Sequence, residues 1–247
     1  EHYYDAMNQI NAAHLVMLSE QRLIDKISAA RLAEAIAHMP SKNEFIKYLS
    51  PELEEIYYNV EAYLSSRVGN EISGWLHLGR SRNDMYATAS RIKVRTVYFD
   101  ICRLVLKVMS AMLKLADIEA ATVITGYTHM QPAEPITVGH YLAGVVEAAE
   151  RDYARLEQSY ERLNLSPMGA CALAGTSHDI DRHLVASLLG FEGFVNNSLD
   201  SVASRDFIPE ILADLAILMI TVSRFAGDLY IWVTDEFSQA EITDSVA

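Results

Sequence analysis

One short stretch, residues 126–135, concentrates groups that could move a proton. It reads Gly-Tyr-Thr-His-Met-Gln-Pro-Ala-Glu-Pro, so Thr128 precedes His129 and Gln131 follows two residues later. An imidazole titrates at about pH 6.5, so small shifts suit it to acid and base catalysis, with Thr128 and Gln131 holding either the imidazole or a substrate carboxylate. A rigid loop with a hydrogen-bonded histidine explains the prolines equally well, and the residues by themselves leave the two interpretations even.

A second polar stretch, residues 77–84, precedes the longest predicted helix and reads His-Leu-Gly-Arg-Ser-Arg-Asn-Asp. The first N–H groups of a helix lack partners and its dipole favours negative charge, so Ser81, Arg82 and Asn83 would form an anion site there. Arginine adds bidentate binding of a carboxylate. Helix capping by Asn83 or Asp84 explains the same residues, and residue types alone favour that interpretation.

The remaining polar stretches favour structural roles. Residues 166–176 are rich in Gly, Ala and Ser, which predicts close packing of the backbone. Residues 197–201 are typical of a capped helix start. His14 and His140 lie in helical stretches, where a structural role is the default. No His, Cys and Asp residues have the spacing of metal ligands and no glycine loop suits a phosphate, so we expect no metal site.

Apolar residues recur with helical spacing along most of the chain. The clearest helix is predicted at about 83–120, where Val94, Ile101, Val108 and Leu115 repeat every seven residues beside further apolar rows. No strand pattern rises above the helical one. We expect further helices at about 5–37 with a break capped by Ser28, at 43–66, 137–165, 181–189 and 198–233, with a loop at 67–74 and a kink or break at Pro209.

These elements predict an all-α protein. We expect a small helical N-terminal layer in residues 1–75 and a long-helix bundle in residues 76–247. A helix of about 35 residues is on the order of 50 Å long. Since that is too long for a compact monomer of this size, we expect partner subunits.

The composition excludes several functions. The 247 residues carry a formal net charge of −13, which argues against nucleic-acid binding because that needs basic patches. The most apolar stretch, residues 207–222, is interrupted by Glu210 and Asp214, so we expect no membrane span. Cys102 and Cys171 are expected to be free thiols. With no recognisable signal peptide, we expect a cytoplasmic protein.

The polar stretches, taken in order, resemble the argininosuccinate lyase branch of the fumarase/aspartase superfamily. Residues 79–84 resemble the family's first signature, and residues 126–132 resemble its second. Ser-Pro-Met-Gly at 166–169, Ile-Asp-Arg at 180–182 and Asn-Ser-Leu-Asp at 197–200 follow in the family's order. Several motifs in one order are far more specific than any single one, and together they cover most of the chain.

The resemblance implies a homotetramer whose active sites are shared between subunits. It implies β-elimination that breaks a C–N bond of a succinyl-type dicarboxylate or polycarboxylate and releases fumarate, without a cofactor. Fixed donors and cations would stabilise the dianion that develops beside the substrate carboxylate. By the match of motifs, His129 is the acid/base residue, Thr128 and Asn83 bind substrate, and Ser81 and Arg82 line the anion site.

The sequence departs from the family pattern in three places. Met85 and Ala89 stand where argininosuccinate lyases usually carry Gln and Asp, so a related aminopolycarboxylate or N-succinyl amino compound fits as well as argininosuccinate. Asn11 is the nearest candidate for an N-terminal substrate-binding serine. The family's third signature, a mobile loop with the catalytic serine and a lysine, would follow Ala247, so we expect that partner of His129 to lie beyond this chain.

A non-catalytic structural protein on the same scaffold, as lens crystallins related to this family are, is the alternative function. It predicts no affinity for succinate or fumarate and no effect of Arg82→Ala. A lyase, in contrast, would release fumarate from N-succinyl amines.

Overall fold

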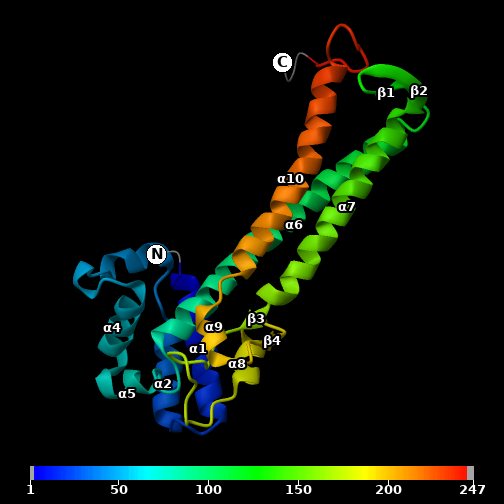
Figure 1. Ribbon diagram of the computed structural model, residues 1–247. Coiled ribbons are helices and arrows are strands. Elements are labelled where there is room, and N and C mark those ends of the chain that lie inside the picture. Colours follow the sequence, from blue (N-terminus) through cyan, green and yellow to red (C-terminus); the bar gives the residue numbers. More distant parts are fainter. Residues whose placement is uncertain (1–2, 244–247) are drawn as a thin grey trace. The chain divides into compact units, whose positions relative to one another are not determined.

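A computed structural model describes residues 3–243, which are mainly helical (Figure 1). The predicted all-α class is confirmed, with two short pairs of strands added to it. The chain forms two compact units. The first contains the residues up to Val97 together with Glu161–Arg205, and the second contains Tyr98–Tyr160 together with the residues from Asp206 on. The predicted domain boundary between residues 75 and 76 stays a prediction.

The first unit is a cluster of short helices with the start of a long one. α1 packs against α2, α4 and α8, and β3 pairs in parallel with β4. Met7, Ile10, Leu18, Leu32 and Met85 are among the buried side chains of its core. Its elements are α1 (Tyr4–Glu20), α2 (Lys26–Ala37), α3 (Lys42–Phe45), the 3₁₀ turns η1 (Ile46–Tyr48) and η2 (Pro51–Leu53), α4 (Ile56–Val68), α5 (Asn70–Trp75), the first part of α6 (Arg82–Ile118), β3 (Leu165–Ser166), α8 (Arg182–Leu188), β4 (Gly193–Phe194) and α9 (Ser198–Ala203).

The cap of α2 differs from the predicted one. The carboxylate of Asp25 accepts hydrogen bonds from the N–H groups of Ile27 and Ser28. Asp25 is therefore the cap, and Ser28 lies within the first turn of the helix. A carboxylate also suits the positive end of the helix dipole.

Two further predictions for the first unit are corrected. The helix predicted at 43–66 is interrupted by the turn at Pro51, because proline has no N–H group to continue a helix. The loop predicted at 67–74 is mostly helix, since α5 begins directly after Gly69. The φ angle of Gly69 is 89°, a conformation that glycine adopts without steric cost, so one residue is enough to separate α4 from α5.

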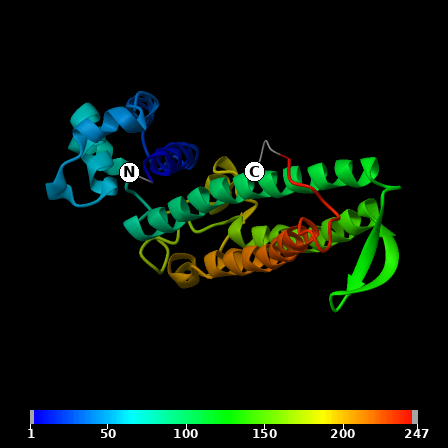
Figure 2. The ribbon, with the colours of Figure 1, turned by 90° about the horizontal axis from the view of Figure 1, so that it is seen from above.

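The second unit consists of three long helices and a hairpin. It contains the rest of α6, β1 (Val123–Thr128), β2 (Gln131–Thr137), most of α7 (Val138–Leu163) and α10 (Phe207–Trp232). The three helices lie side by side in both views (Figures 1 and 2). The predicted break before Pro209 is confirmed. α10 begins at Phe207, so Pro209 lies in its first turn, where an N–H group has no helical partner to lose.

The apolar rows predicted on α6 are only partly covered in this chain. Tyr98 and Cys102 are buried, and the Tyr98 hydroxyl donates to the carbonyl of Leu156 on α7 at 2.7 Å. Leu104 and Ile118 are 62% and 75% exposed. The second unit therefore leaves a broad apolar face open. Among the helices of residues 3–243, none is both long and apolar enough to cross a membrane.

The prediction of no strands is wrong at residues 123–137. β1 and β2 pair antiparallel, with Ile124 opposite Ile136 and Thr128 opposite Gln131. β-branched residues at the base of the hairpin fit such a pleated pair. The two prolines of β2 suggested a loop, but a two-stranded sheet has only edge strands, where a missing N–H group is tolerated.

Candidate active site

His129 lies at the tip of the hairpin, in a strained turn. The strands end at Thr128 and resume at Gln131, so the turn consists of His129 and Met130. Their φ angles are 53° and 61°, the left-handed region that a type I′ turn needs at both positions. Asn and Gly usually occupy these positions, and other residues cost on the order of 1 kcal/mol each. The turn thus carries His129 and Met130 at two positions where Asn and Gly would be more stable.

Close contacts hold the hairpin behind this turn. Gly126 faces two residues of β2 across an irregular register, and a Cβ atom there would lie 2.7 Å from the carbonyl oxygen of Glu134. The ring of Tyr127 packs on Phe237, with centroids 4.8 Å apart. Thr128, His129 and Gln131 remain exposed. The predicted polar residues therefore extend from a well-anchored base into solvent.

A cavity of about 280 Å³ opens beside the hairpin and places Thr128 on its wall. Tyr141 and Asp228 line the same space. The Tyr141 hydroxyl donates to Asp228 at 2.6 Å, and burial, reinforced by this bond, raises the pKa of the phenol above its ordinary value. The cavity is large enough for a small organic molecule that reaches Thr128.

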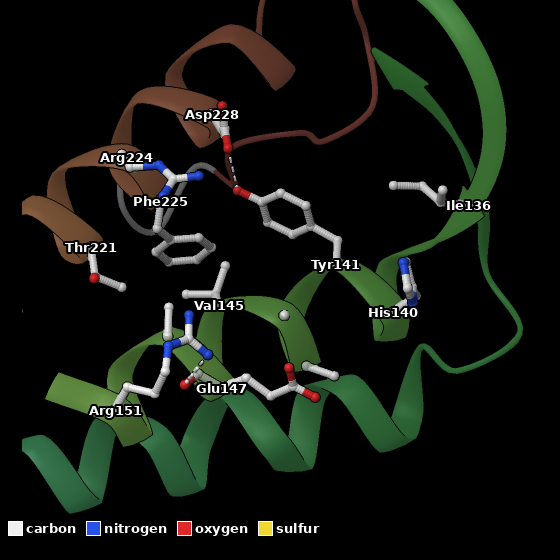
Figure 3. A pocket seen from close by; sticks show the side chains of 13 residues that line it. Ile136, His140, Tyr141, Val145, Glu147, Arg151, Thr221, Arg224, Phe225 and Asp228 are labelled. Carbon is white, nitrogen blue, oxygen red and sulfur yellow. Dashed lines mark hydrogen bonds between the residues drawn. The ribbon is translucent and has the colours of Figure 1, made fainter. Parts of the chain in front are cut away.

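A second cavity, of about 450 Å³, lies between α7 and α10 (Figure 3). It shares Tyr141 and Asp228 with the first cavity. Arg151 of α7 and Arg224 of α10 bring guanidinium groups to its wall. His140, for which we expected a structural role, also lines this space. The two cavities together present polar groups of both charges beside the hairpin.

The stretch at 77–84 leads into α6, but its cap is not the predicted one. Arg82 is already the first helical residue, and the hydroxyl oxygen of Ser81 accepts the N–H of Asn83 at 3.2 Å. Asp84 reaches back and accepts the N–H of Ser81 at 2.9 Å. This reciprocal arrangement is a capping box. Ser81 is therefore the cap, and the prediction of Asn83 or Asp84 in that role is wrong.

Arg82 and Asn83 are accessible at the start of α6. Arg82 is partly exposed and donates to Glu55 at 2.9 Å. Partly exposed ion pairs contribute little to stability, so an incoming carboxylate can replace Glu55 at low cost. Asn83 is exposed and donates through Nδ2 to the carbonyl of Ala172 at 3.1 Å. Arg82 and Asn83 are thus accessible at the start of α6, and the anion site stays a prediction.

A buried polar layer lies beneath these donors, and the residue types did not predict it. Arg80 is buried and donates through Nη1 to Oδ1 of Asn11 at 2.7 Å. His14 is buried too, and its Nε2 lies 2.8 Å from the carbonyl oxygen of Leu78. The spacing of Arg80 and Arg82 could have indicated this layer. Two side chains that are two residues apart in a turn point in different directions, so they need not both be exposed to solvent. The prediction that Asn11 binds substrate stays a prediction.

Two residues that depart from the family pattern do not reach the surface. Met85 and Ala89 are 1% and 0% exposed and belong to the core of the first unit. Met85 also lines a small pocket together with Asn11 and Arg80.

The structure gathers the predicted residues into two groups. One group shares the start of α6 in the first unit, with Asn11 below it, and the other shares the hairpin of the second unit. Within residues 3–243, no group of three or more His, Cys, Asp or Glu side chains is arranged to hold a metal ion.

Known proteins that resemble this chain are lyases. A family model described as "Lyase" matches residues 4–247. "Argininosuccinate lyase 1" of Shouchella clausii is 42% identical over 247 residues, which are 100% of this chain and 50% of the relative. The argininosuccinate lyase of Methanothrix thermoacetophila is 41% identical over 238 residues, which are 96% of this chain and 48% of the relative.

Solved structures give the same result. EDDS lyase in complex with formate matches 100% of this chain and 48% of its own, with a TM-score of 0.89 and 32% identity. A variant of EDDS lyase with bound fumarate matches 96% of this chain and 46% of its own, with a TM-score of 0.86 and 32% identity. The chain spans about half the length of the curated relatives it matches.

Proposed function

This chain belongs to the lyase family within the fumarase/aspartase superfamily, and from that premise we propose that the protein is a carbon–nitrogen lyase that releases fumarate. The observation that carries the proposal is the EDDS lyase variant with bound fumarate, which this chain matches at a TM-score of 0.86. The argininosuccinate lyases at 42% and 41% identity support the same class of reaction.

The proposed reaction is a β-elimination. A base removes the proton next to a carboxylate of the succinyl group, the electron pair forms the double bond of fumarate, and the C–N bond breaks as the amine takes up a proton. His129 is the acid/base residue of this step. The strained turn that carries it supports this role, since such strain persists where function requires it.

The other proposed site residues bind the succinyl group. Ser81 and Arg82 receive a carboxylate at the start of α6, where the helix dipole and a guanidinium both favour negative charge. Asn83, together with Thr128 and Gln131 of the hairpin, orients the substrate through hydrogen bonds. Asn11 supports the anion site through its bond to Arg80.

The proposed substrate is an N-succinyl-type amino acid, either argininosuccinate or a related aminopolycarboxylate. The relatives named argininosuccinate lyase support the first. Met85 and Ala89, which stand where argininosuccinate lyases usually carry Gln and Asp, support the second.

We also propose a homotetramer with shared active sites. α6, α7 and α10 form an apolar groove of about 360 Å³ in the second unit, lined by residues such as Leu104, Val108 and Met219. These three side chains are each more than half exposed in the single chain. An apolar face of this kind is typical of a surface that is covered in the assembly.

The test measures fumarate released from a panel of N-succinyl amines, argininosuccinate included. Replacement of His129 by Asn is expected to lower kcat by about 10²- to 10⁴-fold, the usual contribution of a general acid or base. His38→Asn is the matched control, since His38 is an exposed histidine of the first unit. It should leave kcat unchanged.

Two outcomes would contradict the proposal. A protein that releases no fumarate from any member of the panel is not a lyase of this class. If it also fails to bind fumarate, and Arg82→Ala changes nothing, the protein is a structural relative of the lens-crystallin kind.

A further inference from the structure

Asp84 is fully buried, yet its two oxygens accept three backbone hydrogen bonds. One oxygen accepts the N–H of Ser81 at 2.9 Å, which closes the capping box of α6. The other accepts the N–H groups of Gly169 at 3.1 Å and Cys171 at 2.9 Å. A single carboxylate thereby connects two segments that lie more than eighty residues apart in the sequence, as the separations of 85 and 87 show.

The turn at residues 169–172 is itself held in one conformation. Gly169 has a φ angle of 84°, and a Cβ atom there would lie 2.7 Å from Cγ of Arg182. Arg182 donates through Nε to the carbonyl of Met168 at 3.0 Å and through Nη2 to that of Val195 at 2.9 Å. The turn is therefore fixed from one side by Arg182 and from the other by Asp84.

The same turn also receives a side chain proposed to bind substrate. Asn83 donates through Nδ2 to the carbonyl of Ala172, one residue beyond Cys171. The N–H of Asn83 is bonded to the hydroxyl oxygen of Ser81. A displacement of the turn relative to α6 would therefore move Asn83 directly and Ser81 through the capping box.

Capping alone does not require this arrangement. A cap needs one accepted N–H group, and a partly exposed carboxylate supplies it without losing its water. Asp84 instead gives up all contact with solvent, and this burial raises the pKa of its carboxyl group to about 6. The two further bonds, to Gly169 and Cys171, serve no helix N–H group, which indicates a role beyond holding the helix start.

We propose that Asp84 is a positioning residue of the lyase site. It joins the start of α6 to the turn at 169–172 and thereby sets the positions of Ser81 and Asn83 against the substrate carboxylate. This inference rests on the proposed function, and it adds the turn at 169–172 to the site.

The test compares Asp84→Asn with a matched control, Asp152→Asn. Asparagine has the same shape but one acceptor oxygen, so its amide would face an N–H group that has lost its partner. Asp152 is a buried carboxylate of the second unit that accepts from Thr221 and Arg155. Both variants are first checked for wild-type circular dichroism and a cooperative thermal transition.

Three measurements are expected to separate the two variants. In Asp84→Asn, amide hydrogen exchange in the fragment around residues 166–173 should quicken about tenfold or more, as loss of a charged hydrogen bond allows. The Kd for fumarate and the KM of the elimination should rise about tenfold, with kcat changed less than about threefold, because these contacts bind ground and transition states alike. Asp152→Asn should keep all of these values within about twofold of wild type, since Asp152 has no bond to either segment.

The pH dependence gives a further readout that a purely structural residue would not move. The groups that act on the charge of Asp84 are Arg80, Arg182, Tyr57 and Cys171. As pH falls through about 6, protonation of Asp84 removes its charge and makes one of its oxygens a poorer acceptor, so its bonds to the N–H groups weaken and fumarate should bind more weakly. This step should be absent in Asp84→Asn.

Failure of the inference and failure of the proposed function give different results. Wild-type protein without lyase activity or fumarate binding overturns the proposed function, whereas the exchange rates still show whether Asp84 couples the two segments. Quickened exchange with unchanged Kd and KM makes Asp84 purely structural and overturns the inference. If Asp84→Asn does not fold, Arg182→Lys loosens the same turn from its other side, and an unchanged KM in that variant overturns the inference equally.

Discussion

At the scale of single residues, three polar side chains are buried beneath the candidate site at the start of α6. Arg80, Asn11 and His14 form a layer under the start of α6, and each is almost completely removed from water. The pKa of His14 is lowered to about 3, first by burial and then by the charge of Arg80. His14 is therefore neutral in the folded protein at any pH near 7.

His14 should make stability depend on pH. An unfolded histidine takes up a proton below about pH 6.5, whereas folded His14 does so only near 3. Its contribution is thus fully present above pH 6.5 and is lost as pH falls from there toward 3. In His14→Gln, which keeps a donor for the carbonyl of Leu78, the unfolding free energy should fall less steeply over this range.

Urea titrations at several pH values measure this difference. Replacement of the exposed His38 by Gln is the control and should leave the pH dependence as in wild type. Parallel curves for wild type and His14→Gln would contradict the assignment of His14 as a buried neutral ring.

At the scale of elements, the hairpin depends on the close approach of α6 to α7. Gly139 lies in the first turn of α7, and a Cβ atom there would be 2.5 Å from the carbonyl oxygen of Ala116 and 2.8 Å from the Cα atom of Ala120. Its N–H donates to the carbonyl of Glu119 at 3.1 Å. The two ends of the hairpin are thus held together by backbone contact. A side chain at position 139 would push them apart.

Two glycines of the same helix should respond oppositely to alanine. Gly139→Ala should lower the unfolding free energy by on the order of 1–3 kcal/mol, because backbone atoms must move to admit the methyl group. In Gly144→Ala, where no atom lies within 4 Å of the new Cβ, helix propensity should raise it by about 0.5–1 kcal/mol. Thermal unfolding of the two variants measures the contrast, and equal effects would contradict the close approach.

At the scale of the whole molecule, the second unit has an exposed apolar face that a partner subunit would bury. Leu104 and Val108 lie on α6 with their side chains 62% and 51% exposed. Burying such groups contributes about 25 cal/mol for each Å² removed from water, so an oligomer gains where a monomer does not. This is the physical reason behind the proposed tetramer.

Leu104→Glu should reduce the oligomer, because association would bury an unpaired charge in the groove. The mass in solution, measured by light scattering after gel filtration, should fall toward that of a single chain. The control is Lys107→Glu, a charge reversal at an exposed position of α6 that does not line the groove. A wild-type protein that elutes as a monomer would contradict the proposed assembly.

Local patterns in the sequence determined the helices and the order of the motifs. The rows on α6 predicted its extent closely, and Pro209 predicted the break before α10, because helical periodicity and the missing N–H of proline act within a few residues. The class and the family followed from these local features.

Only the tertiary structure decided how the candidate site is built. Both the turn at His129 and the bonds of Asp84 depend on partners far away in the sequence or on backbone angles that no periodicity reports. The burial of Arg80 is likewise decided by what packs above it. Hydrogen bonding between distant segments and the burial of polar groups are non-local effects. Residue types alone therefore indicated only a helix-capping role for the carboxylate of Asp84.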